Sequence, residues 1–589
     1  MVKERIAALL EEAVQRCVRD GLLPAGQYRV DLETPRQAAH GDFAANVALV
    51  LSKQHAEATG AKKPDPRGLA RAIVDRIEDR EGLLAARPVI AGPGFLNLTL
   101  AQGVWHAALR TVWEERERFG RSDAGRGLRT MVEFVSANPT GPMHVGHGRG
   151  AVIGDVVANL LDWAGYQVFR EFYINDAGGQ VFRLAHATLA RATELRPDVP
   201  RVPLDPEDYQ GEYVKDVAQA WLDAGGDPSR PFAEIREPLR KFATHFILET
   251  LIKKDLQLFG IRFDNFFSEK TLHDEDRLGA AIRVLEAKGM TALEVLPPPK
   301  GVDIDEEEYV PQPLRVVKTT RFGDDRDRPL FKTTGEPTYF AADVAYHFDK
   351  ISRGYRRLID VWGADHGGYV SRMKAAVAAL GGELEVILFQ LVNLMKDGQP
   401  YRMSKRAANF VTLRELLEAA GADATRVFFL LRRGDMALDF DIGLAQKRDN
   451  TNPVFYVQYG HARCAAILRK AREERGLEPR WDPQAVSALQ LPEEIELIKR
   501  VLQLPELIAG AAAALEPHKV VFWLRETIAQ FHGYYTKYKK TERVISGDER
   551  KTAARLYLVW AVKQTLANAL AVLGVEAPER MDAPAAEEE

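Results

Sequence analysis

The stretch from residue 130 to residue 165 constrains the fold most, because a strand, a sharp turn and a long helix follow one another directly. Residues 130–135 have the apolar, β-favouring character of a buried strand. The sequence Ser-Ala-Asn-Pro-Thr-Gly-Pro at 136–142 breaks that strand, and apolar residues then recur at helical spacing until Gly165. Strands, glycine turns and amphipathic helices alternate to about residue 445, which predicts a parallel α/β sheet.

A glycine-rich segment, His-Val-Gly-His-Gly-Arg-Gly at 144–150, lies between this strand and this helix. A strand, a glycine loop and a helix start form a phosphate site, because backbone N–H groups and the helix dipole favour anionic oxygens. His144 and His147 are three residues apart, and each ring can donate a hydrogen bond to phosphate oxygens. Taken alone, the pair fits helix capping equally well. A metal pair is disfavoured because no third ligand accompanies it.

A second basic segment, Tyr-Arg-Met-Ser-Lys-Arg at 401–406, can supply the other half of a nucleotide site. Lys405 would place a mobile point charge against a triphosphate, and the neighbouring arginines can add bidentate contacts. Such a loop is more often a solvated turn when it stands alone. Together with the two histidines it favours ATP over the nicotinamide dinucleotide that the glycines alone would also fit.

The length of 589 residues is too great for one core, so we expect several domains. Residues 1–112 read as an α+β domain, residues 113–447 as the parallel-sheet domain with insertions, and residues 448–589 as an all-α helical bundle.

The overall charge does not indicate a nucleic-acid partner, because 80 Lys and Arg balance 84 Asp and Glu to a net charge of -4. RNA binding would need a locally basic face. Cys17 and Cys464 support neither a disulfide framework nor a cysteine zinc site. The N-terminus is neither a secretory signal nor a transit peptide, and no apolar run approaches the length needed to cross a bilayer. We therefore expect a cytoplasmic protein with no membrane association.

The turn running into His-Val-Gly-His, with Met-Ser-Lys-Arg at 403–406, resembles the H-I-G-H and K-M-S-K-S signatures of class I aminoacyl-tRNA synthetases. Further segments are similar to the arginyl-tRNA synthetase family: Val-Glu-Phe at 132–134, Phe-Tyr-Ile-Asn-Asp at 172–176, Val-Trp-Gly-Ala-Asp-His at 361–366 and His-Gly-Asp-Phe at 40–43. Departures are small. Arg402 and Arg406 replace the outer residues of the second signature, and His366 is followed by glycine where the family often has a second histidine.

This resemblance implies a Rossmann-like catalytic domain, a tRNA-contacting N-terminal domain and a helical anticodon-binding domain. The implied enzyme is an arginine-tRNA ligase that forms arginyl-adenylate from ATP and L-arginine and then charges the arginine isoacceptors of tRNA. Mg²⁺ accompanies ATP, no tightly bound metal is expected, and a monomer is usual for the family. The family generally activates arginine efficiently only when tRNA is bound.

The resemblance also implies roles for individual residues. The catalytic residues are His144, His147 and Lys405. ATP is held by Gly146, Gly363, Asp365, Arg402, Met403 and Ser404. Arginine is held by Glu133, Ser136, Asn138, Tyr339, Asp343 and His366. Residues that contact tRNA are Tyr456, Tyr459, Arg463 and Lys537.

Recognition of arginine is chemically demanding, because a guanidinium is planar, permanently charged and carries five donors. Asp343 would pair with it, and Tyr339, four residues earlier on the same helical face, would pack over it or donate its hydroxyl. Without the resemblance, Glu133 reads as a surface acid at a strand end and Tyr339 as a core aromatic.

Two other functions stay open at this point. A nucleotidylyltransferase of the same superfamily would share the phosphate chemistry but would not need a long helical C-terminal region. A synthetase-like, non-catalytic RNA-binding protein usually loses signature residues, whereas His144, His147, Lys405, Glu133 and Asp343 are all present.

Overall fold

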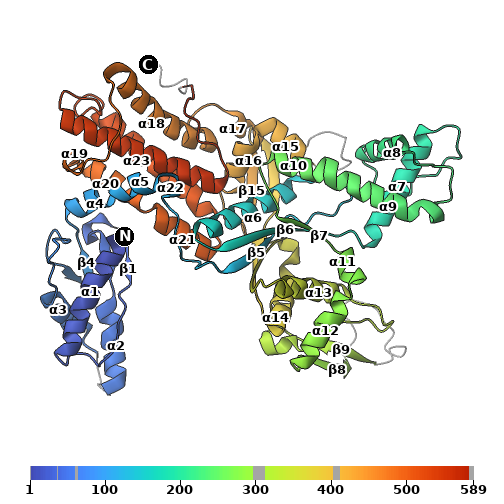
Figure 1. The fold of residues 1–589 in the computed structure, drawn as a ribbon, viewed down its shortest axis with the longest axis horizontal. Helices are drawn as coiled ribbons and strands as arrows, with labels where there is room; N and C mark the ends of the chain where they lie inside the picture. The colour runs from blue at the N-terminus through green and yellow to red at the C-terminus, as the bar shows by residue number, and fades with distance from the viewer. Residues whose placement is uncertain (1, 36, 60–63, 296–311, 402–410, 583–589) are drawn as a thin grey trace. The chain divides into compact units, whose positions relative to one another are not determined.

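The computed structural model describes residues 2–35, 37–59, 64–295, 312–401 and 411–582 (Figure 1). The chain divides into two compact units, each made of several chain segments. The first unit comprises Met1–Phe119, His461–Leu504 and Thr527–Asn568. The second comprises Gly120–Gly460, Pro505–Glu526 and Ala569–Glu589.

A five-stranded parallel sheet lies at the centre of the second unit, as the sequence predicted. Its strand order is β12-β11-β5-β6-β7. The strands are β5 (Arg129–Glu133), β6 (Gln167–Ile174), β7 (Asn265–Ser268), β11 (Arg357–Gly363) and β12 (Glu383–Phe389). The chain builds outward from β5 to β7 and then returns to the other side of β5 with β11. The order therefore reverses between β5 and β11, and in open α/β sheets ligands bind beyond the carboxyl ends of the strands at such a point.

Helix α6 (Val145–Trp163) follows β5 and is buried along most of its length. It ends where predicted, with Gly165 in the left-handed region (φ 86°). Its start corrects one prediction, because the helix already begins at Val145 and the following glycines are helical instead of forming a loop. These glycines permit close packing: a Cβ at Gly148 or Gly150 would collide with the side chains of Leu413 or Phe389.

Further elements of the second unit surround this sheet. A helical insertion contains α7 (Gly179–Leu195), α8 (Tyr213–Asp223) and α9 (Phe232–Phe246), followed by a π-helical turn (Ile247–Ile252) and α10 (Lys253–Leu258). The remaining helices are α11 (Lys270–Asp274), α12 (Arg277–Ala287), α13 (Tyr339–Ser352), α14 (Val370–Leu380), α15 (Leu413–Ala420), α16 (Ala422–Phe429) and α17 (Ile442–Gln446). Two small sheets are β10-β9-β8 (Arg328–Pro329, Pro313–Val317, Thr291–Val295) and β14-β13-β15 (Gln399–Pro400, Val392–Lys396, Leu438–Asp441).

The N-terminal part of the first unit is α+β, as predicted. Its four-stranded antiparallel sheet has the order β1-β2-β4-β3 (Leu32–Glu33, Phe43–Ala45, Phe95–Leu98, Val89–Ala91). The helices are α1 (Val2–Arg19), α2 (Val47–Thr59), α3 (Pro66–Asp75), α4 (Gln102–Ala108) and α5 (Arg110–Glu115). Helix α1 buries Ile6, Leu10 and Val14 on one face, which is the 3.6-residue pattern of its sequence.

Every described element after residue 450 is helical, as predicted. These helices are α18 (Pro453–Arg475), α19 (Pro483–Val486), α20 (Pro492–Leu502), α21 (Leu504–Ala514), α22 (His518–Tyr538) and α23 (Glu549–Leu573). Helix α23 corrects the expectation about apolar length, because it is long and apolar enough to cross a membrane. However, 72% of its apolar window is buried within the protein, which is the property of a core helix.

Candidate active site

Helix α6 begins with a reciprocal pair of histidines. The backbone N–H of His147 donates to Nδ1 of His144 (3.2 Å), and that of His144 donates to Nδ1 of His147 (3.3 Å). The two rings stack at 3.6 Å between centroids. Because each Nδ1 accepts a hydrogen bond, each neutral ring carries its proton on Nε2.

Electrostatics keep these rings neutral. Burial lowers the pKa of both histidines, and together with the neighbouring His144 it lowers the pKa of His147 to about 3. The capping role that the sequence allowed is therefore present, and it orients each ring as an Nε2–H donor. Neutral N–H donors at the positive end of a 19-residue helix suit phosphate oxygens.

The second signature lies outside the described residues, so the roles of Arg402, Met403, Ser404 and Lys405 stay predictions. The residues that follow this segment lie against the start of α6. The backbone N–H of Leu413 donates to the carbonyl of Met143 (2.7 Å), and Thr412 forms an isolated bridge with His144.

Arg149 on α6 links the histidine helix to two other segments. Its buried guanidinium donates to the backbone carbonyls of Gln390 (2.8 Å), Met436 (2.8 Å) and Arg433 (3.0 Å). These carbonyls precede β13 and β15, two strands that pair in parallel. The sequence pattern does not predict this role, although an arginine placed among glycines at the start of a helix is a signal for it.

Glu133, at the carboxyl end of β5, is buried, so it is not a surface acid. Its Oε2 lies 2.5 Å from Nζ of Lys350, and its Oε1 accepts a hydrogen bond from Ser136 Oγ (2.9 Å). Ser136 Oγ in turn accepts the backbone N–H of Tyr173 (3.1 Å). Val135 and Ser136 adopt left-handed φ values of 69° and 43°. For a β-branched residue this backbone is strained, and such strain is typical of functional sites.

Tyr339 and Asp343 occupy the first two turns of α13 at the predicted spacing, but their environments differ. Tyr339 is 91% exposed, so it is not a core aromatic. The Asp343 carboxylate accepts a hydrogen bond from the hydroxyl of Tyr369 (2.7 Å), and burial raises its pKa. Tyr369 was not singled out from the sequence.

Three carboxylates converge around Tyr173 of β6. The ring of Tyr173 packs against Tyr346 (4.5 Å) and Phe267 (6.3 Å). Burial, followed by the charges of Glu269, Asp343 and Glu133, raises its pKa, and its hydroxyl hydrogen-bonds with Glu269. These acids come from β5, α13 and the residue after β7, so they form an acidic site at the carboxyl ends of the strands.

The other predicted site residues lie near strand ends. Asn138 donates through Nδ2 to Gln180 (2.9 Å). Gly363 ends β11, and Asp365 and His366 follow it in an exposed helical turn where His366 Nε2 lies 3.5 Å from the Asp365 carboxylate. Gly146 lies in the first turn of α6, where a Cβ would approach the ring of His144.

Comparison with curated proteins decides the family. The arginine–tRNA ligase of Anaeromyxobacter sp. (strain Fw109-5) is 47% identical to this chain, covering 99% of it and 98% of the relative. That of Citrifermentans bemidjiense is 42% identical, covering 98% of this chain and 100% of the relative. The chain belongs to the arginyl-tRNA synthetase family.

Family models and a solved structure agree with this assignment. The arginyl tRNA synthetase N terminal domain matches residues 2–100, the class I (R) catalytic domain matches residues 114–200, and the DALR anticodon binding domain matches residues 457–581. The arginyl-tRNA synthetase of Thermus thermophilus superposes with a TM-score of 0.71 at 21% identity, covering 99% of this chain and 100% of that one, and shows the same fold. The predicted family resemblance is confirmed.

The residues predicted to contact tRNA are largely engaged with other side chains. In the second unit, Tyr459 is 8% exposed and stacks on Phe455, and Tyr456 is half-buried. In the first unit, the guanidinium of Arg463 lies 4.9 Å from the ring centroid of Tyr535, and Lys537 pairs with Glu493 (2.5 Å). Their assignment to tRNA therefore stays a prediction.

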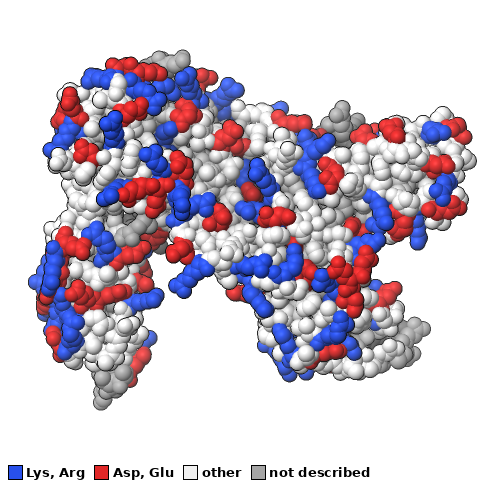
Figure 2. Space-filling view, in the orientation of Figure 1, with Lys and Arg blue, Asp and Glu red and all other residues white. Residues whose placement is uncertain are grey.

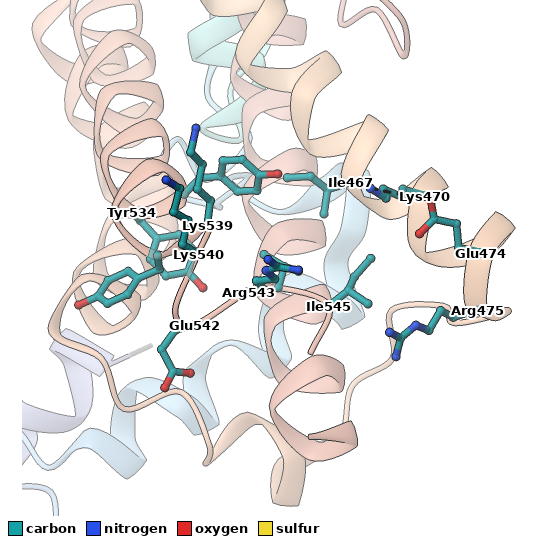
Figure 3. Close-up of a pocket in the computed structure, with 13 residues that line it drawn as sticks. Ile467, Lys470, Glu474, Arg475, Tyr534, Lys539, Lys540, Glu542, Arg543 and Ile545 are labelled. Atoms are coloured by element: carbon teal, nitrogen blue, oxygen red, sulfur yellow. Dashed lines mark ion pairs between the residues drawn. The ribbon is translucent and has the colours of Figure 1, made fainter. Parts of the chain in front are cut away.

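A basic and aromatic pocket lies within the first unit. It has a volume of about 460 Å³. Residues at the end of α18 line one side of it, and residues at and after the end of α22 line the other (Figure 3). Its lining includes Tyr534, Tyr535, Tyr538, Lys470, Arg475, Lys539, Lys540 and Arg543. Figure 2 shows both signs of charge interspersed over the visible face, with Lys and Arg gathered over α3. Basic character is thus local, as RNA binding in a chain of near-zero net charge requires.

Proposed function

We propose that the chain activates L-arginine with ATP beyond the carboxyl ends of β5 and β11 and transfers the arginyl group to tRNA. One observation carries this proposal. The acidic site includes Glu133 at the end of β5, and the turn after β5 leads directly into the start of α6. Arginine is a cation that needs the acidic site, and the triphosphate of ATP is an anion that needs the N-terminus of α6. The reaction requires the two environments to lie side by side.

The activation step needs no protein nucleophile. The carboxylate of arginine attacks the α-phosphorus of ATP, the bond from this phosphorus to the oxygen that bridges to the β-phosphate breaks, and pyrophosphate leaves. Mg²⁺ bound with ATP would offset part of the negative charge of the phosphates. His144 and His147 donate Nε2–H to the phosphates, and Lys405 supplies a further positive charge from the second signature. Catalysis is then positioning and charge stabilisation. A hydroxyl of the 3′-terminal adenosine of tRNA next takes the acyl group and releases AMP.

ATP is held by residues at the two halves of the site: Gly146 of α6, Gly363 and Asp365 after β11, and Arg402, Met403 and Ser404. Asp343 and Tyr339 bind the guanidinium, while Glu133, Ser136 and Asn138 hold the substrate beside β5 and His366 lies next to the arginine or the adenylate. Lysine lacks the planar fork, so it would leave carboxylate oxygens unpaired. This selectivity would make a separate editing activity unnecessary.

The tRNA is bound by parts outside the sheet. Residues 1–112 serve as a tRNA-contacting domain, residues 113–447 as the catalytic domain and residues 448–589 as the anticodon-binding domain, with Tyr456, Tyr459, Arg463 and Lys537 among its contacts. Aromatic rings can stack exposed bases while lysines and arginines neutralise phosphates. The protein acts in the cytoplasm as a monomer, without a tightly bound metal.

Charging of total tRNA with each of the twenty amino acids, in the presence of ATP and Mg²⁺, tests this function. We expect arginine alone to be attached. Charging by another amino acid would reject the pocket assignment, and charging by none would favour a non-catalytic RNA-binding protein. Adenylylation of a small phosphorylated substrate without tRNA would instead favour a nucleotidylyltransferase.

A further inference from the structure

A fully buried lysine lies directly behind the acidic site. Lys350, in the last turn of α13, places Nζ 2.5 Å from Oε2 of Glu133 and 3.0 Å from Oδ1 of Asp360 on β11. The same Nζ lies 4.4 Å from the ring centroid of Tyr346. Two carboxylates and one aromatic face therefore surround an ammonium group that has three donors.

Stability alone does not explain this arrangement. Removing three charged groups from water is expensive, and well-packed apolar residues in place of a buried ion pair are often neutral or stabilising. The triad also occupies a particular place, because Glu133 and Asp360 are paired neighbours in register on β5 and β11, where the strand order reverses. The lysine thus joins the two strands whose carboxyl ends form the site.

Lys350 also fixes the orientation of Glu133. One carboxylate oxygen of Glu133 is held by Lys350 and the other by the hydroxyl of Ser136. Each carboxylate oxygen has a second lone pair, so the group can still accept hydrogen bonds from a ligand. A carboxylate held at both oxygens meets an incoming cation without having to reorient, which is preorganisation of the binding site.

The charges around Glu133 depend on Lys350. Lys350, His347 and Tyr346 face it from α13, Asp360 from β11 and Tyr173 from β6. Burial raises the pKa of Glu133, the charge of Lys350 lowers it, and the charge of Asp360 raises it. Although burial opposes ionisation of Asp360, the charges of Lys350 and His347 lower its pKa to about 2. Without the lysine, two buried carboxylates would face each other and one would take up a proton.

We propose that Lys350 is a positioning residue for arginine, which keeps Glu133 ionised and oriented toward a cationic group of the bound amino acid. This inference rests on the proposed function, in which Glu133 contacts arginine. Lys350 itself does not touch the substrate, and its effect reaches arginine only through Glu133. Nothing in this role concerns ATP.

The test compares steady-state aminoacylation by wild type and Lys350→Met across acidic to neutral pH. Loss of the positive charge raises the pKa of Glu133, so this carboxyl takes up a proton at a higher pH. The acid limb of kcat/KM for arginine should therefore move to higher pH. At neutral pH the KM for arginine should rise roughly tenfold or more, while the KM for ATP changes by less than about twofold.

Two further variants separate this inference from a structural effect. In the Glu133→Gln background the carboxyl through which Lys350 acts is absent, so adding Lys350→Met should leave the KM for arginine and its acid limb unchanged. Lys288→Met is a matched control, because Nζ of Lys288 donates to the carbonyl of Leu380 (2.6 Å) and is not part of the site. If Lys350→Met does not fold, Lys350→Gln serves in its place, because it also removes the positive charge but keeps a hydrogen-bond donor for the two carboxylates.

The outcomes are distinguishable. If Glu133→Gln leaves the KM for arginine unchanged, the proposed contact between Glu133 and arginine is wrong. If Glu133→Gln raises that KM but Lys350→Met moves neither the KM nor the acid limb, the positioning role is overturned. A fall in thermal stability with unchanged arginine kinetics would also overturn it.

Discussion

At the scale of single residues, the two histidines show how structural and chemical roles can coincide. Each imidazole accepts a backbone N–H through Nδ1, which caps α6 and leaves the ring proton on Nε2. The depressed pKa values keep both rings uncharged at neutral pH. Nothing has to reorganise when charge develops on a phosphate nearby, and this preorganisation is the main source of such catalysis.

Substitution of His147 tests this role. His147→Ala removes one preorganised donor, so we expect the activation step to slow by roughly 10²–10³-fold. The measurement is arginine-dependent exchange of pyrophosphate into ATP in the presence of tRNA. His186→Ala, in the helical insertion, is the matched control and should leave the exchange rate near that of wild type. A loss below about threefold for His147→Ala would refute the assigned role.

Residue patterns in the sequence identified part of this site and missed the rest for a physical reason. His144, Glu133 and Asp343 lie in local motifs, so the family resemblance could indicate them. Lys350, Tyr369 and Glu269 take their roles from the order of the strands, which brings α13 and β11 beside β5. A buried lysine on an apolar helix gives no local signal of the carboxylates that it faces.

At the scale of elements, α6 is the part on which the site depends. The sequence predicted its end and its apolar face, but not that its glycines are helical. Only the packing shows why: Gly148 and Gly150 face Leu413 and Phe389, which are distant in sequence. Arg149 on the same helix joins it to the segments that precede β13 and β15.

Replacement of this arginine should therefore affect stability. Arg149→Met removes the three hydrogen bonds that the buried guanidinium donates to backbone carbonyls, so we expect unfolding to become easier by about 3 kcal/mol. Denaturant unfolding at neutral pH measures this change. Arg196→Met is the control, since Arg196 is exposed and pairs with its sequence neighbour Asp198, and it should leave the midpoint unchanged. Equal midpoints for both variants would contradict the linking role of Arg149.

At the scale of the whole molecule, the proposed sites of chemistry and of tRNA binding belong to different parts of the chain. The acidic site and the histidine helix lie in the second unit, and the basic pocket between α18 and α22 lies in the first. The sequence indicated these classes of structure from periodicity alone, as α/β and all-α. The sequence could not indicate that the N-terminal 119 residues form one compact unit with segments that begin at residue 461, because this association depends on tertiary packing.

Substitutions in the basic pocket should weaken tRNA binding without affecting the chemistry. For Lys539→Ala combined with Lys540→Ala, we expect the KM for tRNA to rise several-fold and its dependence on salt to become shallower, because fewer phosphates are neutralised. The KM values for arginine and ATP serve as internal controls and should stay near those of wild type. An unchanged KM for tRNA would place the RNA contact elsewhere.

The central claim is that two acids recognise arginine: Glu133 at the carboxyl end of β5 and Asp343 in the first turns of α13. The substitution Asp343→Asn tests this claim most directly. The substitution keeps the shape of the side chain and its contact with Tyr369 but removes the charge that pairs with a guanidinium. Loss of a buried charge partner should raise the KM for arginine by roughly 30-fold or more, with the KM for ATP nearly unchanged. An unchanged KM for arginine in Asp343→Asn would contradict the account.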